Sequence, residues 1–178
     1  MKTFNKIFFN IVVFASLISC NTEPYDGEVG MNGNQDPLQN TKPGDFKVDF
    51  DGETFIADFT SVTFYSETIV LVGEKPDQGE SIYLVAFGEE PEEGTYMLGV
   101  NTNQAAYYEP NGFGGENAWV ATIDLFTPRG ELVILEIDEE NKTISGTFVF
   151  TGSKPPDHLN SKEFTNGVFN ALPYESLR

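Results

Sequence analysis

Residues 46–59 read FKVDFDGETFIADF, and this stretch decides the fold. From Phe46 to Phe50 apolar residues alternate with polar ones, which is the period-two pattern of a strand that buries one face. Asp51 and Gly52 follow, and both residue types accept the positive φ of a tight hairpin turn. The alternation resumes at Phe55, Ala57 and Phe59. We therefore expect a β-hairpin whose return strand extends to Phe59.

The rest of the chain continues in the same manner. Short runs rich in Val, Ile, Thr, Phe and Tyr occupy residues 62–65, 69–73, 81–87, 95–98, 119–126, 131–137 and 143–151. Turn-forming residues such as those at 75–79 and 128–130 separate these runs. Apolar residues do not follow helical spacing over any window of a dozen residues. We predict one all-β domain over residues 46–178, built as an antiparallel β-sandwich or a small β-barrel, because periodicity does not distinguish the two.

The first residues have the pattern of an export signal. Lys2 and Lys6 precede an apolar run over residues 7–18 that only Asn10 and Ser16 interrupt. A basic start followed by such a run is typical of a secretory signal peptide. The run has roughly a dozen residues, whereas a transmembrane helix needs about 20. We therefore predict a signal peptide over residues 1–19 rather than a permanent membrane span.

Residues 17–20 (LISC), at the end of this run, resemble the lipobox of bacterial lipoproteins. The resemblance implies cleavage before Cys20 and a thioether-linked diacylglycerol on that residue. Cys20 is the single cysteine, so acylation removes a thiol that could form no internal disulfide. The alternative is an ordinary secretory signal with an incidental cysteine at its end. The lipobox resemblance favours a protein that is lipid-anchored in the cell envelope. We expect it in the outer membrane of a Gram-negative bacterium, either on the periplasmic face or at the cell surface.

A polar segment separates Cys20 from the predicted domain. Residues 21–44 are mostly Asn, Thr, Glu, Pro, Asp, Gly and Gln, and their few apolar residues follow no period. Such a segment buries too little apolar surface to offset its ordering entropy. We interpret residues 20–45 as the lipidated cysteine and a disordered, flexible linker, which by coil scaling holds the domain on the order of 25–30 Å from the anchor.

Charge restricts the possible partners. The chain has 10 basic and 28 acidic residues, and without the two lysines of residues 1–19 its formal net charge is −20. Nucleic acid and anionic headgroups repel such a protein. We therefore expect no nucleic-acid partner, and we expect the membrane to be contacted only through the diacylglycerol on Cys20, whose two acyl chains suffice for stable anchoring.

Four stretches of the predicted domain carry recognisable motifs. They are residues 46–55 (FKVDFDGETF), 94–96 (GTY), 139–150 (EENKTISGTFVF) and 164–170 (FTNGVFN). Together, and in this order, they resemble a family of uncharacterised lipoproteins from Bacteroidota. The similarity covers most of residues 46–174. It implies an envelope lipoprotein of β architecture, and it supplies no catalytic residues because the family has no assigned activity.

We interpret these motifs as elements of the fold rather than of a ligand site, which is the alternative. Residues 139–142 should form a polar hairpin loop. The inward face of the following strand is expected at Ile144, Phe148 and Phe150. Gly146 and Gly167 are positions where a bulge or a close backbone approach is expected.

The residue types of known catalytic and metal sites are sparse. His158 is the only histidine, it lies in a Pro-rich loop, and no G-x-S-x-G motif accompanies it. A zinc site would have only carboxylates besides this histidine and the lipidated cysteine. The acids cluster at expected turns, at 89–93 and 138–140, where we interpret them as solubilising charge, with weak Ca²⁺ binding or a catalytic pair as alternatives. We predict no enzyme, no metal and no cofactor.

Residues 107–119 (YYEPNGFGGENAW) form the most unusual segment. The candidate ligand-binding residues are its aromatic residues Tyr107, Tyr108, Phe113 and Trp119. A long Gly- and Asn-rich loop could present these rings to a glycan or to an envelope protein. Alternatively, the tyrosines and the tryptophan are strand ends that pack into the core. Our hypothesis for the whole chain is a non-enzymatic accessory domain that binds a glycan or protein partner, and the alternative is an assembly subunit of an outer-membrane complex.

Overall fold

The computed structural model describes residues 36–88, 92–100, 102–110, 117–121, 127–156 and 158–177. The predicted signal peptide, Cys20 and most of the predicted linker lie outside these residues, as does Phe113. Nowhere in the described ranges is there a helix long and apolar enough to cross a membrane.

Eleven strands form one hydrogen-bonded sheet, which confirms the all-β prediction. They are β1 (Phe46–Phe50), β2 (Glu53–Ile56), β3 (Phe59–Tyr65), β4 (Thr68–Lys75), β5 (Glu80–Phe87), β6 (Gly94–Leu98), β7 (Gln104–Tyr108), β8 (Ala118–Val120), β9 (Gly130–Asp138), β10 (Thr143–Ser153) and β11 (Ser161–Ser176). Their order in the sheet is β2-β1-β11-β3-β4-β5-β7-β8-β10-β9-β6, and β11 also pairs with β10.

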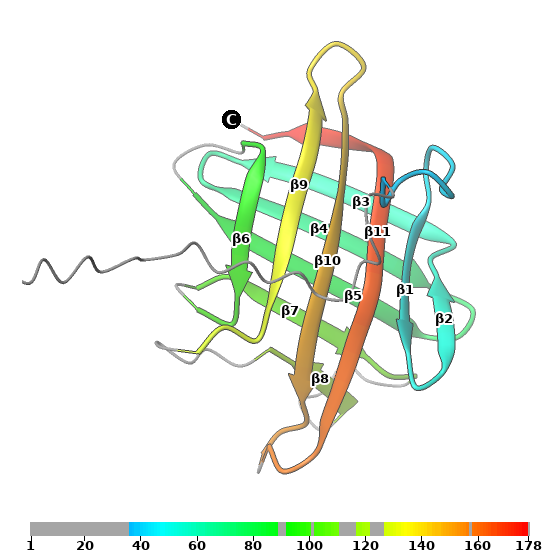
Figure 1. Ribbon diagram of the computed structural model, residues 1–178, viewed down its shortest axis with the longest axis vertical. Helices are drawn as coiled ribbons and strands as arrows, with labels where there is room; N and C mark the ends of the chain where they lie inside the picture. Colours follow the sequence, from blue (N-terminus) through cyan, green and yellow to red (C-terminus); the bar gives the residue numbers. More distant parts are fainter. Residues whose placement is uncertain are drawn as a thin grey trace, which may run out of the picture. The chain divides into compact units, whose positions relative to one another are not determined.

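The sheet folds into two layers (Figure 1). Strands β6, β9, β10, β11, β1 and β2 form one layer, and β3, β4, β5, β7 and β8 run across behind it. The end of β11 crosses to the second layer, where Tyr174 pairs in parallel with Val62 of β3. At the opposite end Ser153 of β10 pairs with Val120 of β8. The ladder therefore closes on itself around two packed layers, and the structure combines features of both predicted architectures.

Large apolar side chains fill the space between the layers. The largest fully buried ones are Phe46, Phe55, Phe148, Phe164, Phe169, Ile69, Leu71, Ile82, Leu84, Leu98, Leu132 and Ile134. Phe150 and Phe164 stack with ring centroids 4.1 Å apart, and β10 and β11 thereby contribute adjacent rings. Burial of this apolar area is the main stabilising contribution to the fold.

The hairpin predicted at residues 46–59 is present but shorter than expected. Asp51 and Gly52 have φ of 52° and 79°, as a tight turn between twisted strands requires. The return strand β2 ends at Ile56, and Phe59 instead begins β3. The extension to Phe59 was wrong because the chain changes partner here: the backbone N–H of Asp58 donates to Glu74 of β4.

The end of the predicted linker is hydrogen-bonded to the domain. Residues 36–45 form turns, and the Gly44 N–H donates to the Asn170 carbonyl of β11 at 2.7 Å. The Asn170 N–H in turn donates to the Asp45 carbonyl at 3.0 Å. These backbone bonds attach the residues just before β1 to β11.

The structure confirms the expected close approach at two glycines. The ladder of β10 shifts register between Ser145 and Gly146. A Cβ on Gly146 would overlap the Val133 carbonyl and would lie 2.5 Å from a ring carbon of Phe169. A Cβ on Gly167 would similarly overlap the carbonyl and ring of Phe148. Both positions therefore require a residue without a side chain.

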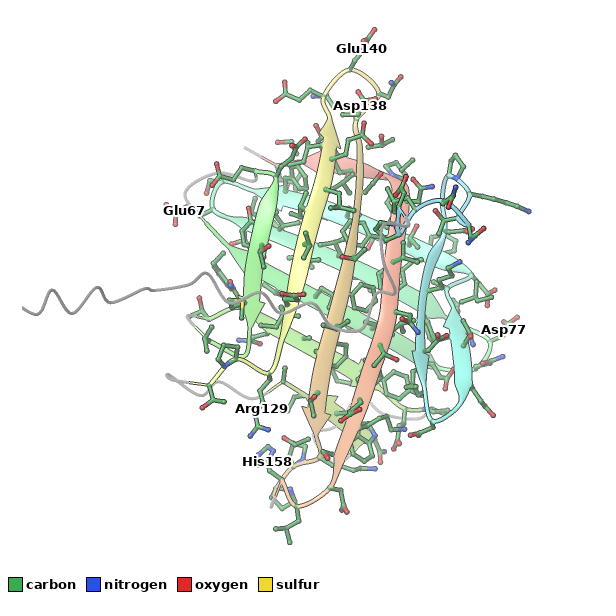
Figure 2. All side chains as sticks on the ribbon, viewed as in Figure 1. Glu67, Asp77, Arg129, Asp138, Glu140 and His158 are labelled. Atoms are coloured by element: carbon green, nitrogen blue, oxygen red, sulfur yellow. The ribbon has the colours of Figure 1, made fainter. Side chains whose placement is uncertain are left out.

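Acidic residues project from the turns. Residues 139–142 connect β9 to β10 as the predicted polar loop. Figure 2 shows Glu140 at this loop, Glu67 at the β3–β4 turn and Asp77 at the β4–β5 turn, all pointing away from the layers. Such positions suit solvated charge that keeps a protein soluble.

Candidate functional site

Tyr107, one of the four candidate residues, belongs to the core. Its side chain is 3% exposed, and its hydroxyl donates a 2.6 Å hydrogen bond to Oε1 of Glu80. Its ring lies 4.8 Å from that of Phe50 and 5.5 Å from that of Phe164. Burial, then the hydrogen bond to Glu80 and the charges of nearby acids, raise the pKa of Tyr107 well above its usual value. The phenol therefore stays neutral and fixed in the interior.

Trp119 lies beside Tyr107 and also faces inward. The two residues are register partners between β7 and β8, so their side chains share one face of the ladder. The indole Nε1–H donates a 2.8 Å hydrogen bond to Oε1 of Glu109. Trp119 is half-buried and packs against the edge of the hydrophobic core.

Lys162 fills the space in front of these rings. Its ammonium nitrogen lies 4.8 Å from the ring centroid of Trp119, 5.1 Å from that of Phe50 and 5.5 Å from that of Tyr107. It also forms a 2.7 Å ion pair with Asp51, and its side chain is only 11% exposed. We call Lys162 and its three ring partners the Lys162 cluster. The protein's own cation thus occupies the aromatic site that the sequence suggested for a ligand.

A second lysine completes the polar edge of this cluster. The Lys154 ammonium forms a 2.8 Å ion pair with Oε2 of Glu109 and lies 5.4 Å from the centroid of the Trp119 ring. Burial alone would raise the pKa of Glu109, but hydrogen bonds from Lys154 and Trp119 and the charges of the two lysines outweigh it. The pKa of Glu109 is therefore below its usual value, and the carboxylate remains ionised.

His158 has a hydroxyl partner that the sequence did not indicate. The Oγ of Ser153, at the end of β10, lies 2.8 Å from Nδ1 of His158. Ser153 is 5% exposed, whereas His158 is exposed and has a positive φ of 55°. The serine is the buried member of the pair, and the imidazole covers it from the loop between β10 and β11.

Tyr108, the third candidate, lies on the other side of the sheet. Adjacent residues of a strand point to opposite faces, so Tyr108 points outward where Tyr107 points inward. Its ring meets that of Tyr83 edge-on, with centroids 5.4 Å apart and an interplanar angle of 82°. The structure therefore does not bring the candidate residues together: two are in the Lys162 cluster, one is on the outer surface, and Phe113 is outside the described residues.

The surface that carries Tyr108 is the outer face of the second layer. Its outward positions are Phe59, Ser61, Thr63 and Tyr65 of β3, Thr68, Val70, Val72 and Glu74 of β4, Ser81, Tyr83, Val85 and Phe87 of β5, and Gln104, Ala106 and Tyr108 of β7. The alternating positions between them point into the core. We call these fifteen positions the outer face.

The outer face is almost free of charge in a strongly acidic protein. Glu74 is its only ionisable acid, and none of its positions is Lys or Arg. The pKa of Tyr83 is raised by burial first and then by the charge of Glu74. Glu175 of β11 pairs with Thr63 and so adds an acid at the border. The remaining outward positions present aromatic, aliphatic, hydroxyl and amide groups.

Among the residues that the structure describes, exposed aromatic rings lie only on this surface. Phe59, Tyr65 and Phe87 are 67%, 47% and 43% exposed, and they are the only exposed Phe, Tyr or Trp side chains in the ranges that the structure describes. Tyr65 and Phe87 both flank Thr68, the first as its partner in β3 and the second as its partner in β5. Reasoning from the sequence missed these residues.

A metal site needs several ligating side chains around one ion. Across the described ranges, no three His, Cys, Asp or Glu side chains lie close enough together to hold a metal ion.

Comparison with known proteins places the chain in a family. The family model described as "Domain of unknown function (DUF6252)" matches residues 40–173. No curated protein and no solved structure matches the chain. The match begins at the turns that are hydrogen-bonded to β11 and includes all but the last residues of that strand. The chain therefore belongs to the DUF6252 family, and the matched residues form most of the two-layered β structure described above.

Proposed function

We propose that this protein is a lipid-anchored, non-enzymatic accessory domain of the cell envelope, which binds its partner on the outer face. The observation that carries the proposal is the confinement of Phe59, Tyr65 and Phe87 to one nearly uncharged surface. Exposed aromatic residues gathered on one patch are typical of binding surfaces.

Two features support the non-enzymatic part of the proposal. The hydroxyl of Ser153 is buried beneath His158, whereas a nucleophile must reach its substrate. At the edge of the Lys162 cluster, Glu109 accepts hydrogen bonds from Trp119 and Lys154 through its two oxygens. A carboxylate held ionised in this way is unsuited to act as a general acid at neutral pH.

The lipid anchor is supported by the sequence at residues 17–20 and by charge. A net charge of −18 gives no electrostatic attraction to anionic headgroups. Acyl chains on Cys20 would supply the hydrophobic attraction instead. We expect the full chain to sediment with membranes and the Cys20→Ala variant to appear in the soluble envelope fraction, still folded. Sedimentation of that variant with membranes would contradict the anchor.

Photocrosslinking in cells tests the binding surface. A benzophenone-bearing phenylalanine analogue at position 87 reacts with C–H bonds of whatever lies against it, whether sugar or protein. The matched control is the same analogue at position 135, because Leu135 is 41% exposed on β9 of the other layer, close to the 43% of Phe87. We expect an adduct from position 87 and none from position 135.

Each outcome of this experiment has a clear meaning. If neither position gives an adduct, the proposed binding function is wrong. Protein adducts of equal yield at both positions would instead fit an assembly subunit that is enclosed by a larger complex.

A further inference from the structure

We infer that the ligand of the outer face is an uncharged polysaccharide. This inference rests on the proposed function and specifies its partner. It starts from the chemistry of the surface, which combines exposed rings with hydroxyl and amide side chains and carries only one ionisable acid.

Charge excludes several classes of partner. A polyanion would be repelled by a protein with 28 acidic and 10 basic residues. A basic partner would need acids on the surface it contacts, and Glu74 is the only one on the outer face. The ligand that matches this surface is therefore neutral.

The arrangement of groups favours a sugar over an apolar protein surface. Tyr65 and Phe87 lie two strands apart, which corresponds to about 10 Å, and Thr68 lies between them. This spacing is comparable to the length of a disaccharide unit. The rings can stack on the apolar faces of two pyranoses while hydroxyl groups such as those of Thr63 and Thr68 bond the sugar hydroxyls.

The size and composition of the surface agree with this assignment. Three strand spacings by seven residues give roughly 15 by 20 Å, or about 300 Å². Protein–protein interfaces are enriched in Arg and Met. The outer face has neither residue type. A short segment of a polysaccharide chain fits the length and width of this surface.

Binding by the detergent-solubilised full chain tests the inference. The probes are neutral β-glucan, α-glucan, mannan and xylan, with polygalacturonate as the anionic comparison, titrated against the immobilised protein. We expect saturable binding of at least one neutral polymer, none of polygalacturonate, and affinity that is unchanged between 0.05 and about 0.5 M salt because no ion pairs are involved.

Substitution of the rings locates the site. Tyr65→Thr and Phe87→Thr keep a residue with high β propensity, and each should reduce the association constant about tenfold. Leu135→Thr is the control, because it removes a side chain of similar exposure from the other layer, and it should leave affinity unchanged. The thermal unfolding midpoint of every variant shows whether the fold is intact. If Tyr65→Thr is poorly folded, Phe87→Thr alone provides the comparison with Leu135→Thr.

The results separate this inference from the proposed function. Binding to none of the neutral polymers, or equal binding by Phe87→Thr and the unmodified chain, overturns the inference. If no polymer binds and position 87 crosslinks to a protein in cells, the outer face remains a binding surface for a protein partner. If no polymer binds and position 87 gives no adduct, the proposed function fails as well.

Discussion

The ammonium of Lys162 lies 4.8 Å from the centroid of the Trp119 ring. This contact explains why Tyr107 and Trp119 do not form an open ligand site. Phe50 and Tyr107 approach the same nitrogen from other directions. The rings that could have stacked on a ligand are occupied by a cation from β11.

Lys162 is expected to contribute substantially to stability. Lys162→Met preserves most of the side-chain volume but removes the cation from the rings and leaves Asp51 without this ion pair. Because the ammonium is largely shielded from water, we expect the free energy of unfolding to fall by about 1–3 kcal/mol. Urea denaturation, monitored by tryptophan fluorescence, measures this change in the free energy of unfolding.

Lys42→Met provides the control for this substitution. Lys42 is exposed in the turns before β1, so its replacement should change the free energy of unfolding by less than about 0.5 kcal/mol. Equal stability of the two variants would show that the Lys162 cluster is energetically unimportant.

Tyr107 should make the free energy of unfolding fall as the pH rises in the alkaline range. Its folded pKa is raised above the unfolded value of about 10, so the stabilisation is fully present below pH 10 and is lost as pH rises toward the folded pKa. In Tyr107→Phe the free energy of unfolding should fall less steeply with pH. Tyr83, whose pKa is also raised, should supply part of the remaining pH dependence.

Thermal unfolding midpoints measured between pH 8 and about 11 test this dependence. At pH 7 the Tyr107→Phe variant should be less stable by about 1 kcal/mol, because it loses the hydrogen bond to Glu80. Identical alkaline slopes for the two proteins would rule out a buried, neutral phenol at position 107.

Two glycines should respond differently to the same substitution. Gly146→Ala places a methyl group against the Val133 carbonyl and the Phe169 ring, and we expect a loss of about 3 kcal/mol or more. Gly52→Ala has open space around its Cβ, and only its φ of 79° opposes it, so about 1 kcal/mol should be lost. Chemical denaturation measures the free energy of unfolding of both variants. A larger loss for Gly52→Ala than for Gly146→Ala would contradict the packing described at Gly146.

The sequence predicted the fold class because local rules determine it. The Asp51–Gly52 turn and the alternation of β1 depend on neighbouring residues only, and both are present. By contrast, β11 was not predicted, because its irregular backbone interrupts the alternation. Asn166 and Ala171 have φ of 53° and 46°, and this strand is held by pairing with β1, β10 and β3 rather than by its own pattern.

The candidate site was harder to predict than the fold. In β4 the outward residues Val70 and Val72 are as apolar as their inward neighbours Ile69 and Leu71, so periodicity could not reveal which face is exposed. Lys162 lies 43 residues from Trp119 and 112 from Phe50, and only the closed ladder brings the three together. Nothing in the local sequence around Trp119 indicates that a lysine covers it.

Trp119 should affect stability but not binding. Trp119→Phe keeps a ring near Lys162 but loses the hydrogen bond to Glu109, and we expect a loss of about 1 kcal/mol. Because Trp119 faces inward, the yield of the adduct from position 87 should not change. A binding defect in this variant at unchanged stability would place the partner at the Lys162 cluster and not on the outer face.

The tether on Cys20 is the claim on which both the location and the role of the domain depend. Mass spectrometry of the N-terminal peptide from the native membrane protein tests it most directly. We predict a peptide that begins at Cys20 and carries the added mass of a diacylglycerol on its sulfur. An unmodified thiol at Cys20, or a peptide that still contains residues 1–19, would contradict the account.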